Sequence, residues 1–235
     1  MSVRVRRITT TRAGGVSRPP FDSFNLGDHV GDDPGAVATN RGRLASAIGR
    51  PADHVVWMNQ VHGDHVEIVD EPRAEPVDAT DALVTGTPGL ALAVITADCV
   101  PVLMADARAG VIGAAHAGRV GAAEGVVLRT LDAMLAAGAH VADITVLLGP
   151  AVSGENYEVP EEMAADVETR LPGSRTTTLR GTPALDLRAG IARQLIDAGV
   201  TAIDIDPRCT VADPALFSHR RGAPTGRLAS LVWME

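Results

Sequence analysis

The sequence predicts a mixed α/β domain in which strands and helices alternate along the chain. Three apolar runs, at 90–96, 100–105 and 111–116, have the length and near-continuous hydrophobicity of strands that are buried on both faces. Segments with helix start and stop residues flank these runs, and such alternation is typical of α/β and α+β folds. No stretch has the composition of a linker or repeats another, so we expect one domain over residues 1–235.

The first third of the chain is expected to contain an edge strand, a loop, a helix and a strand pair. Turn-forming residues fill the loop at 11–20. Asp33 and Pro34 have the pattern of a helix start, and that helix should run to about residue 48. The expected strands are 3–9, 55–58 and 66–69, and the last two are expected to pair with each other around the turn at 60–63.

The remainder should contain three more helices separated by strands. The helix that follows His116 should end near residue 136, because Gly138 is a favourable stop residue. Pro160 marks the start of a second helix, and Asp186 has the position of an N-cap for a third that ends at Gly199. The helices and strands expected here are 122–136, after the turn at 117–121, then 144–148, 160–171, 186–198, 202–205 and 229–233.

Composition excludes several classes of protein. The net charge of −8 and the 3% aromatic content argue against a nucleic-acid partner, which would need a basic face or stacking platforms. The chain has no lysine at all, so all 21 of its Lys and Arg residues are arginine. A P-loop, a pyridoxal-phosphate Schiff base and a protein kinase site each require a lysine, and all three are therefore excluded.

The chain has no features of an exported or membrane protein. Its N-terminus is charged and lacks the apolar core of a signal peptide, and its longest apolar run, 89–95, is far shorter than a membrane span. Two cysteines are too few for a disulfide framework. We expect a cytoplasmic protein that does not bind membranes, either a monomer or a weak homodimer.

Three residues able to bind a metal stand where strand-like runs meet turns. They are His62 in Asn59-Gln60-Val61-His62-Gly63, Cys99 before Val100-Pro101, and His116 before Ala117-Gly118. Two imidazoles and a thiolate make the protein half of an open zinc site, with the fourth position left for water or substrate. His65 competes with His62, since spacing does not decide which ring points inward.

A structural explanation competes with the metal site for each residue. Free cysteine is usually buried and inert, and a single histidine beside glycine is usually a satisfied surface or core residue. Asp98 favours the functional interpretation of Cys99, because a carboxylate is costly inside an apolar run unless it is paired or exposed. For Arg220, Arg221 and Arg227, a solvated or salt-bridged surface position is the default.

Eleven segments of the chain resemble successive signatures of the YfiH/laccase-domain family. Their order and spacing match that family from about residue 8 to residue 233. The segments are 9–17, 24–27, 40–41, 59–63, 96–103, 116–118, 148–151, 157–159, 208–210, 217–221 and 225–227.

The resemblance implies a single α/β domain of the CNF1/YfiH-like type with a zinc centre at His62, Cys99 and His116. It also implies a purine nucleoside phosphorylase, acting on adenosine, guanosine, inosine and methylthioadenosine with phosphate as co-substrate, and an adenosine deaminase activity. Arg41 is then expected to contact phosphate, because it matches the family's arginine after asparagine. Asn25 and Gln60 are expected to line the pocket.

One departure from the family pattern concerns the segment after His116. The family commonly has His-Ala-Gly-Trp-Arg-Gly, whereas this chain has His116-Ala117-Gly118-Arg119-Val120-Gly121. Arg119 is therefore expected either to form an altered pocket wall or to face solvent.

The two implied reactions need different groups. In deamination, zinc lowers the pKa of its water to about 7, and a carboxylate must carry protons to the leaving amine. Asp98 is the candidate for that catalytic role, or else for orienting a histidine ligand from behind. Phosphorolysis needs a bound anion, for which arginine is the only permanently charged donor here. Arg41 and the backbone amides of 118–121 are the expected cradle.

Three alternative functions compete with the zinc enzyme. A copper-dependent polyphenol oxidase is one, because two histidines and a cysteine accept copper as well as zinc. Its weakness is that seven histidines are too few for the several copper centres of a laccase. A metal-independent cysteine hydrolase with Cys99 as nucleophile and His116 as base is another. An interaction domain without catalysis is the third.

Overall fold

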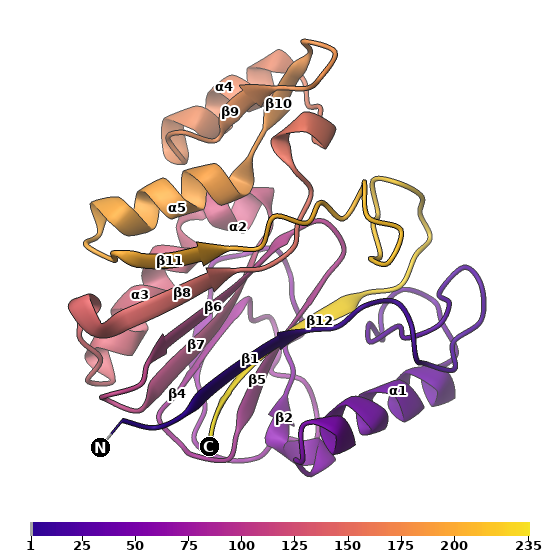
Figure 1. Ribbon diagram of the computed structural model, residues 1–235, viewed down its shortest axis with the longest axis vertical. Coiled ribbons are helices and arrows are strands. Elements are labelled where there is room, and N and C mark those ends of the chain that lie inside the picture. The colour runs from indigo at the N-terminus through magenta and orange to yellow at the C-terminus, as the bar shows by residue number, and fades with distance from the viewer. Residues whose placement is uncertain (1) are drawn as a thin grey trace.

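The fold contains two stacked β-sheets, seen in a computed structural model that describes residues 2–235 (Figure 1). The four-stranded sheet has the order β1 (Val5–Thr9), β12 (Leu228–Met234), β5 (Ala91–Thr96) and β2 (Val55–Val56). The six-stranded sheet has the order β11 (Ala202–Ile205), β8 (Ile144–Leu148), β6 (Val100–Asp106), β7 (Val111–Ala117), β4 (Ala82–Thr85) and β3 (Val66–Ile68). Both sheets mix parallel and antiparallel pairs, which confirms the predicted mixed α/β class.

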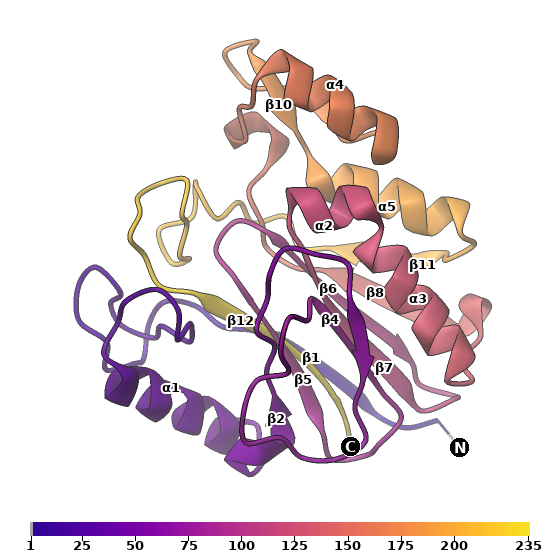
Figure 2. The same cartoon turned by 180° about the vertical axis from the view of Figure 1, so that it is seen from behind.

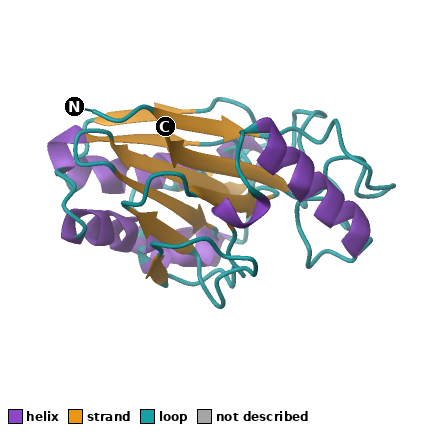
Figure 3. Ribbon diagram, turned by 90° about the horizontal axis from the view of Figure 1, so that it is seen from below, coloured by secondary structure: helices purple, strands orange, loops and turns teal. Residues whose placement is uncertain are grey.

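Helices cover the outer faces of both sheets, as Figures 2 and 3 show from behind and from below. Helix α1 packs on the four-stranded sheet, and α2, α3 and α5 lie over the six-stranded one. Helix α4 packs against the small β9–β10 hairpin. The bounds are α1 (Pro34–Ala47), α2 (Arg119–Glu124), α3 (Val126–Ala136), α4 (Glu161–Arg170), α5 (Leu187–Asp197), β9 (Arg175–Thr177) and β10 (Pro183–Leu185). Short 3-10 helices span η1 (Ala52–His54), η2 (Val141–Asp143) and η3 (Gly154–Asn156).

This layering explains the near-continuous apolar runs of the central strands. In β5, Leu92 and Val94 pack between the two sheets, whereas Ala93 and Ile95 pack on the side of α1. Every residue of β5, β6 and β7 is buried. Both faces of each strand need apolar side chains, because each face is covered by another layer.

The expected helix starts at Asp33 and Asp186 are confirmed. The Asp33 carboxylate accepts a hydrogen bond from the Gly35 amide, and the Asp186 carboxylate accepts one from the Ala189 amide. Each satisfies an amide that the first helical turn leaves without a partner.

Three expectations about secondary structure were wrong. Strands β2 and β3 do not pair with each other: β2 pairs with β5 and β3 with β4, in different sheets. The helix expected over 122–136 begins earlier, at Arg119, and is two helices, because Gly125 at φ +91° ends α2 before α3 begins. Strand β4 and the β9–β10 hairpin were not expected at all. These features depend on long-range pairing, which local periodicity does not encode.

The crossing from one sheet to the other creates the place where the candidate ligands meet. Strand β5 of the four-stranded sheet leads through residues 97–99 directly into β6 of the six-stranded sheet. Val100, at the start of β6, pairs with Ala117 at the end of β7, so Cys99 and His116 lie at the same sheet edge. Within the described part of the chain, no helix is long and apolar enough to cross a membrane.

Candidate functional site

The structure brings His62, Cys99 and His116 together. One potential ligand atom from each lies within 4.8 Å of the others, and Cys99 Sγ is 3.9 Å from His62 Nε2. Two ligands on a tetrahedral zinc ion at ordinary bond lengths are about 3.5 Å apart, so the donor set fits such an ion with little adjustment. Across residues 2–235, no other group of three such side chains has this spacing.

A buried carboxylate that sequence reasoning missed holds this arrangement. Asp81 is fully buried and accepts a hydrogen bond from His116 Nδ1 at 2.8 Å. The same carboxylate accepts the amides of Val61, His62 and Gly63 at 3.1, 3.0 and 2.8 Å. Asp81 therefore orients one imidazole directly and fixes the turn that carries the other. Its only sequence signal was a carboxylate immediately before the apolar run at 82–84.

That turn also selects His62 over His65. His62 takes a left-handed conformation, φ +63°, and its ring lies edge-on to the ring of His116 with the centroids 4.7 Å apart. The side chain of His65 is 60% exposed and lies 3.5 Å from the carboxylate of Glu67. Spacing left the choice open, and the turn geometry held by Asp81 decides it.

Two glycines allow the start of helix α2 to pack directly on His62, Cys99 and the turn that carries His62. A Cβ atom on Gly118 would lie 2.8 Å from His62 Cδ2 and 3.3 Å from Cys99 Sγ. A Cβ atom on Gly121 would lie 2.4 Å from the carbonyl oxygen of Gly63. Both contacts are too close for any side chain, so the glycines serve packing around the candidate ligands.

The charges of the candidate ligands are strongly coupled. Burial by itself would raise the pKa of the Cys99 thiol, but the charge and hydrogen bonds of His116 and His62 bring that pKa down to about 6. Burial would lower the pKa of His116, but the Cys99 thiolate and Asp81 raise it to about 9. Without a metal, this pair is a thiolate and an imidazolium near neutral pH.

Asp98 has a different position from the one expected for a carboxylate behind a histidine ligand. Its Oδ1 accepts the Thr210 hydroxyl at 2.6 Å, and its Oδ2 accepts the Arg220 amide at 2.7 Å. The residue has φ +101° and lines the same cavity as Cys99. Asp98 therefore ties two C-terminal loops to the site, and Asp81 has the orienting role that was one of the two alternatives for Asp98.

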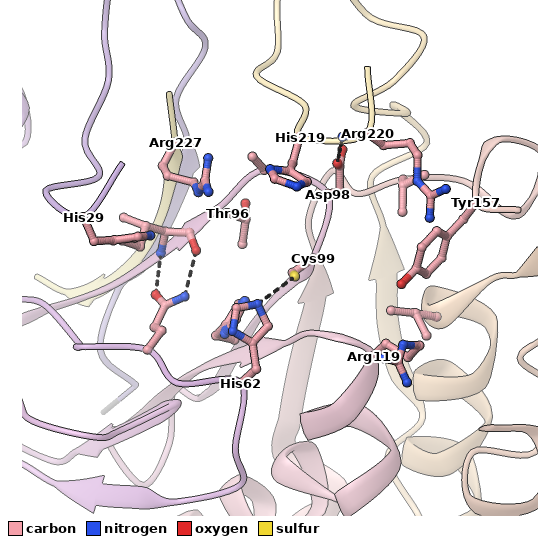
Figure 4. A pocket seen from close by; sticks show the side chains of 16 residues that line it. His29, His62, Thr96, Asp98, Cys99, Arg119, Tyr157, His219, Arg220 and Arg227 are labelled. Carbon is pink, nitrogen blue, oxygen red and sulfur yellow. Dashed lines mark hydrogen bonds between the residues drawn. The ribbon is translucent and has the colours of Figure 1, made fainter. Parts of the chain in front are cut away.

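The candidate ligands form part of the wall of a cavity of about 360 Å³, shown in Figure 4. This volume lies within the range of small-molecule sites in proteins. The lining residues come from distant segments: His29, Gln60, His62, Ile95, Thr96, Ala97, Asp98, Cys99, His116, Arg119, Val152, Tyr157, Leu187, His219, Arg220 and Arg227.

The three residues expected to bind substrate differ in their positions. Gln60 lines the cavity, but its side-chain amide is engaged with the backbone N–H and C=O of Ile95, both at 2.8 Å. Asn25 and Arg41 are not among the lining residues. Asn25 is fully buried, and its Oδ1 accepts the amides of Gly27 and Arg227 at 3.0 and 2.8 Å.

Arg41 lies behind the cavity wall. Its Nε donates to the carbonyl of Leu26 at 3.0 Å, its Nη2 lies 3.1 Å from the Asp28 carboxylate, and its guanidinium stacks on Trp57 at 4.2 Å. Each of these contacts is internal to the protein. In this geometry Arg41 supports the segment that carries His29, which itself lines the cavity.

The cavity is lined by guanidinium groups that have no carboxylate partner. Within residues 2–235, Arg119, Arg220 and Arg227 make no ion pair with a carboxylate. Twelve arginines elsewhere do, among them Arg12, Arg41 and Arg208. Arg220 has the exposed position that was its default, but it also lines the cavity, whereas Arg227 and Arg119 are half-buried in the cavity wall. In a chain of net charge −8, this concentration of unpaired cations indicates an anionic ligand.

Tyr157 lies between two of these arginines. The guanidinium of Arg220 lies 5.0 Å from its ring centroid, and Figure 4 shows its hydroxyl pointing into the cavity. Burial and the nearby Cys99 charge raise the pKa of Tyr157, and the neighbouring Arg119 and Arg220 only partly offset this. The phenol therefore remains a proton donor at neutral pH. Sequence reasoning gave no role to Tyr157, His29, Thr96 or His219, although most of them lie in or beside the eleven signature segments.

Comparisons with known proteins agree over nearly the whole chain. A family model described as multi-copper polyphenol oxidoreductase laccase matches residues 6–235. A Mycobacterium tuberculosis H37Rv protein named purine nucleoside phosphorylase is 74% identical over 235 residues, covering 100% of this chain and 94% of the relative. A Corynebacterium glutamicum protein named purine nucleoside phosphorylase is 58% identical over 232 residues, covering 98% and 94%.

A solved structure has the same fold. The crystal structure of the Bacillus licheniformis hypothetical protein YfiH aligns with a TM-score of 0.92 at 33% identity, covering 98% of this chain and 93% of that one. The resemblance noted from the sequence motifs is thus confirmed by whole-chain identity and by architecture. The chain belongs to the YfiH/laccase-domain family.

Proposed function

We propose that this chain is a zinc-dependent purine nucleoside phosphorylase that cleaves adenosine, guanosine, inosine and methylthioadenosine with inorganic phosphate. The observation that carries the proposal is that a two-histidine, one-cysteine donor set and three arginines without carboxylate partners line the same cavity. Relatives at 74% and 58% identity are named purine nucleoside phosphorylase, which supports the same reaction class.

Zinc is the metal that this donor set favours. Two neutral imidazoles and a thiolate, with room for a fourth ligand, are a common protein environment for catalytic zinc. When bound, zinc supplies Lewis-acid polarisation of an oxygen or nitrogen on the substrate or water. The chain's own contribution is orientation, because Asp81 and Gly118 hold the histidine and cysteine side chains in place.

The proposed reaction balances without any further reactant. An oxygen of hydrogen phosphate forms a bond to the ribose C1′, and the bond from C1′ to the purine nitrogen breaks. The purine leaves with the electron pair of that bond and takes up one proton, which hydrogen phosphate gives up on becoming the sugar phosphate. Tyr157, a protonated phenol in the cavity, is placed to donate a hydrogen bond to the departing purine.

Adenosine deamination is the second reaction that we propose for the same cavity. It requires water in place of phosphate and a group that passes protons to the leaving amine. Asp98 lines the cavity and is the nearest candidate in sequence to Cys99, although both of its oxygens already accept hydrogen bonds.

The test combines metal stoichiometry with product analysis. Purified full-length protein is incubated with adenosine in the presence and absence of phosphate, and the products are separated by chromatography. We expect one zinc per chain, adenine with ribose 1-phosphate when phosphate is present, and inosine as the product of deamination. Adenosine that stays intact with zinc-loaded protein and phosphate would refute the phosphorylase proposal.

A cysteine hydrolase is the second candidate, and one observation favours it. Asp81, His116 and Cys99 form a carboxylate–imidazole–thiolate series with a thiol pKa of about 6, which is the arrangement of a nucleophilic cysteine. The position of His62 beside the same sulfur favours metal binding instead. Chelation separates the two candidates, because a thiol enzyme keeps its activity without metal and a zinc enzyme loses it.

A copper polyphenol oxidase is a weaker alternative despite the description of the matching family model. A laccase needs several copper ions, and the described residues contain one group with ligand spacing. Metal analysis of protein produced without added copper, together with a polyphenol oxidation assay, distinguishes this alternative from the zinc enzyme.

A further inference from the structure

One buried hydroxyl group in the cavity wall has no partner within the protein. Thr96 is 2% exposed, and its Oγ1 makes no hydrogen bond, although the side chain lines the cavity. It is the only one of the seven unpartnered buried polar atoms found in residues 2–235 that lies in this wall. Leaving a buried hydroxyl without a partner is costly, so a ligand that supplies the partner is expected.

Arg227 immediately precedes the strand that pairs with Thr96. Thr96 pairs with Leu228 in the four-stranded sheet, which places Arg227 next to the end of β5. In Figure 4, Arg227, His29 and Thr96 are grouped on one side of the cavity, and Tyr157 and Arg119 lie on the other. Arg227 and Arg119 therefore face different parts of a ligand in this cavity.

The backbone and stem of Arg227 are fixed by neighbours that leave part of its guanidinium free. Its amide donates to Asn25 Oδ1 at 2.8 Å, and its Nη1 donates to the carbonyls of Thr225 and Gly226 at 2.9 and 3.2 Å. A Cβ atom on Gly27 would lie 2.6 Å from Arg227 Cγ, so this glycine permits the loop to pack on the arginine stem. Nε and Nη2 make no hydrogen bond to the described residues and remain available to a ligand.

His29 completes this side of the cavity and is supported from behind. Its Nδ1 lies 3.5 Å from the Asp28 carboxylate, and that carboxylate lies 3.1 Å from Arg41 Nη2. The series from Arg41 through Asp28 to His29 connects helix α1 to the loop that precedes it. Arg41 therefore reaches the cavity only through the residues that it supports.

We propose that Arg227, Thr96 and His29 form the subsite for the inorganic phosphate co-substrate, and that Asn25 and Arg41 are positioning residues behind it. This inference rests on the proposed phosphorylase function. A guanidinium with two free donors matches the oxyanion pairs of phosphate, and a hydroxyl and an imidazole add hydrogen bonds to the remaining oxygens. In this proposal, phosphate contacts residues that line the cavity, and Arg41 makes no direct contact with it.

The first experiment measures the dependence of nucleoside cleavage on phosphate. We expect Arg227→Gln to raise the KM for phosphate about tenfold or more, because a charge-assisted hydrogen bond is lost, with the KM for nucleoside changed far less. Thr96→Val should raise the phosphate KM by a smaller factor, and Thr96→Ser, which keeps the hydroxyl, should not. Arg43→Gln is the matched control, because Arg43 is exposed on α1 and bonds only the Gly14 carbonyl.

The positioning residues have a separate readout. Arg41→Gln should raise the phosphate KM less than Arg227→Gln does. Arg41→Lys, which keeps a positive charge beside Asp28, should restore part of the phosphate affinity that Arg41→Gln loses. A phosphate KM that rises more in Arg41→Gln than in Arg227→Gln would return the direct contact to Arg41 and overturn the assignment.

The second experiment makes the subsite testable without turnover. Binding of inorganic phosphate to zinc-loaded protein is measured by calorimetry for wild type, Arg227→Gln and Arg43→Gln, with metal content and thermal unfolding checked for each. If Arg227→Gln weakens phosphate binding but the wild-type protein cleaves no nucleoside, the proposed function is refuted and the subsite stands. The subsite is refuted if folded Arg227→Gln and Thr96→Val carry out nucleoside phosphorolysis with an unchanged KM for phosphate and bind phosphate as wild type does.

Discussion

The two sides of the cavity are built in different ways. The metal side, which carries the candidate ligands His62, Cys99 and His116, comes from the middle of the chain. These residues are held by a fully buried carboxylate, Asp81, and by a glycine at van der Waals contact, Gly118. The side with Arg227 joins the loop at 25–29 to the segment before β12, two parts of the chain that are about 200 residues apart. There the supports are a hydrogen bond from the Arg227 amide to the Asn25 side chain and contacts of the partly exposed Asp28 carboxylate with His29 and Arg41.

This difference indicates a division of labour. Metal ligands require fixed positions, and buried hydrogen bonds to a carboxylate supply that rigidity because the surrounding dielectric is low. A co-substrate must enter and leave, and ion pairs that are accessible to water hold its site more loosely. We therefore expect substitutions on the metal side to have larger effects than those on the phosphate side.

The largest expected effect is the loss of the Cys99 thiolate. Cys99→Ser replaces the thiolate of the proposed zinc site with a hydroxyl that stays protonated, so metal affinity should fall by more than about 100-fold and nucleoside cleavage should fall with it. Metal content by mass spectrometry and initial rates measure both quantities. Cys209→Ser is the control, since Cys209 accepts hydrogen bonds from Ser153 instead. Full metal content in Cys99→Ser would remove Cys99 from the ligand set.

The next largest effect is expected at the carboxylate behind the ligands. Asp81→Asn removes the charge that orients His116, and metal affinity should fall by about 10–100-fold with the protein still folded. Competition with a chromogenic chelator measures the affinity. Asp70→Asn, at an exposed position, should have no effect. Equal affinities for the two variants would show that Asp81 serves the turn at 61–63 and not the metal.

A smaller effect should follow from crowding the metal side without changing any ligand. Gly118 has φ −73°, which alanine adopts without strain, so Gly118→Ala tests only the contact with His62 and Cys99. Overpacking of this kind costs about 1–3 kcal/mol, and we expect metal affinity to fall about tenfold. Gly42→Ala has open space around its Cβ and is the control. Unchanged metal affinity would mean that the ligands shift freely.

The smallest effect is expected on the phosphate side, at Asp28. A hydrogen bond from His29 and the charge of Arg41 lower the pKa of Asp28 to about 2, against a smaller opposing effect of burial. Because this folded-state pKa lies below the ordinary value of 3.8, the stabilisation is present above about pH 4 and is lost as the pH falls through 2. The carboxylate is about half exposed, so we expect less than about 1 kcal/mol.

Denaturant unfolding of wild type and Asp28→Asn measures this contribution. The difference in the free energy of unfolding should be largest at about pH 6 and should shrink at about pH 3, where the wild-type carboxylate begins to be protonated. A difference that is the same at both pH values would show that the charge of Asp28 does not contribute, and would leave His29 without that support.

Local sequence signals were sufficient for most helices and for the central strands. The Asp33 and Asp186 carboxylates accept hydrogen bonds from amides two and three residues away, and Pro34 has no amide N–H that needs a partner. The starts of α1 and α5 can therefore be predicted from the local sequence. Apolar runs indicated β5, β6 and β7 because each is covered on both faces. The same signals did not show that β2 and β3 belong to different sheets, since neither short strand contains information about its partner.

The candidate site shows the same boundary between local and long-range information. His62, Cys99 and His116 were accessible from the sequence because their chemistry is rare and each follows an apolar run or turn. Arg41 and Asn25 were expected in the pocket, yet they lie behind it, because motif position does not determine the direction of a side chain. Asp81 and Thr96 were missed as functional residues because burial around a polar group is a property of the assembled fold.

The sequence by itself therefore determined the class of fold, the candidate ligands and the absence of lysine chemistry, since each follows from residue type and local periodicity. Tertiary structure alone decided which histidine faces the cysteine, which carboxylate orients it and which arginine reaches the cavity. Those choices depend on hydrogen bonds and close packing between segments that are distant in sequence, such as Asp81 with His116 and Asn25 with Arg227.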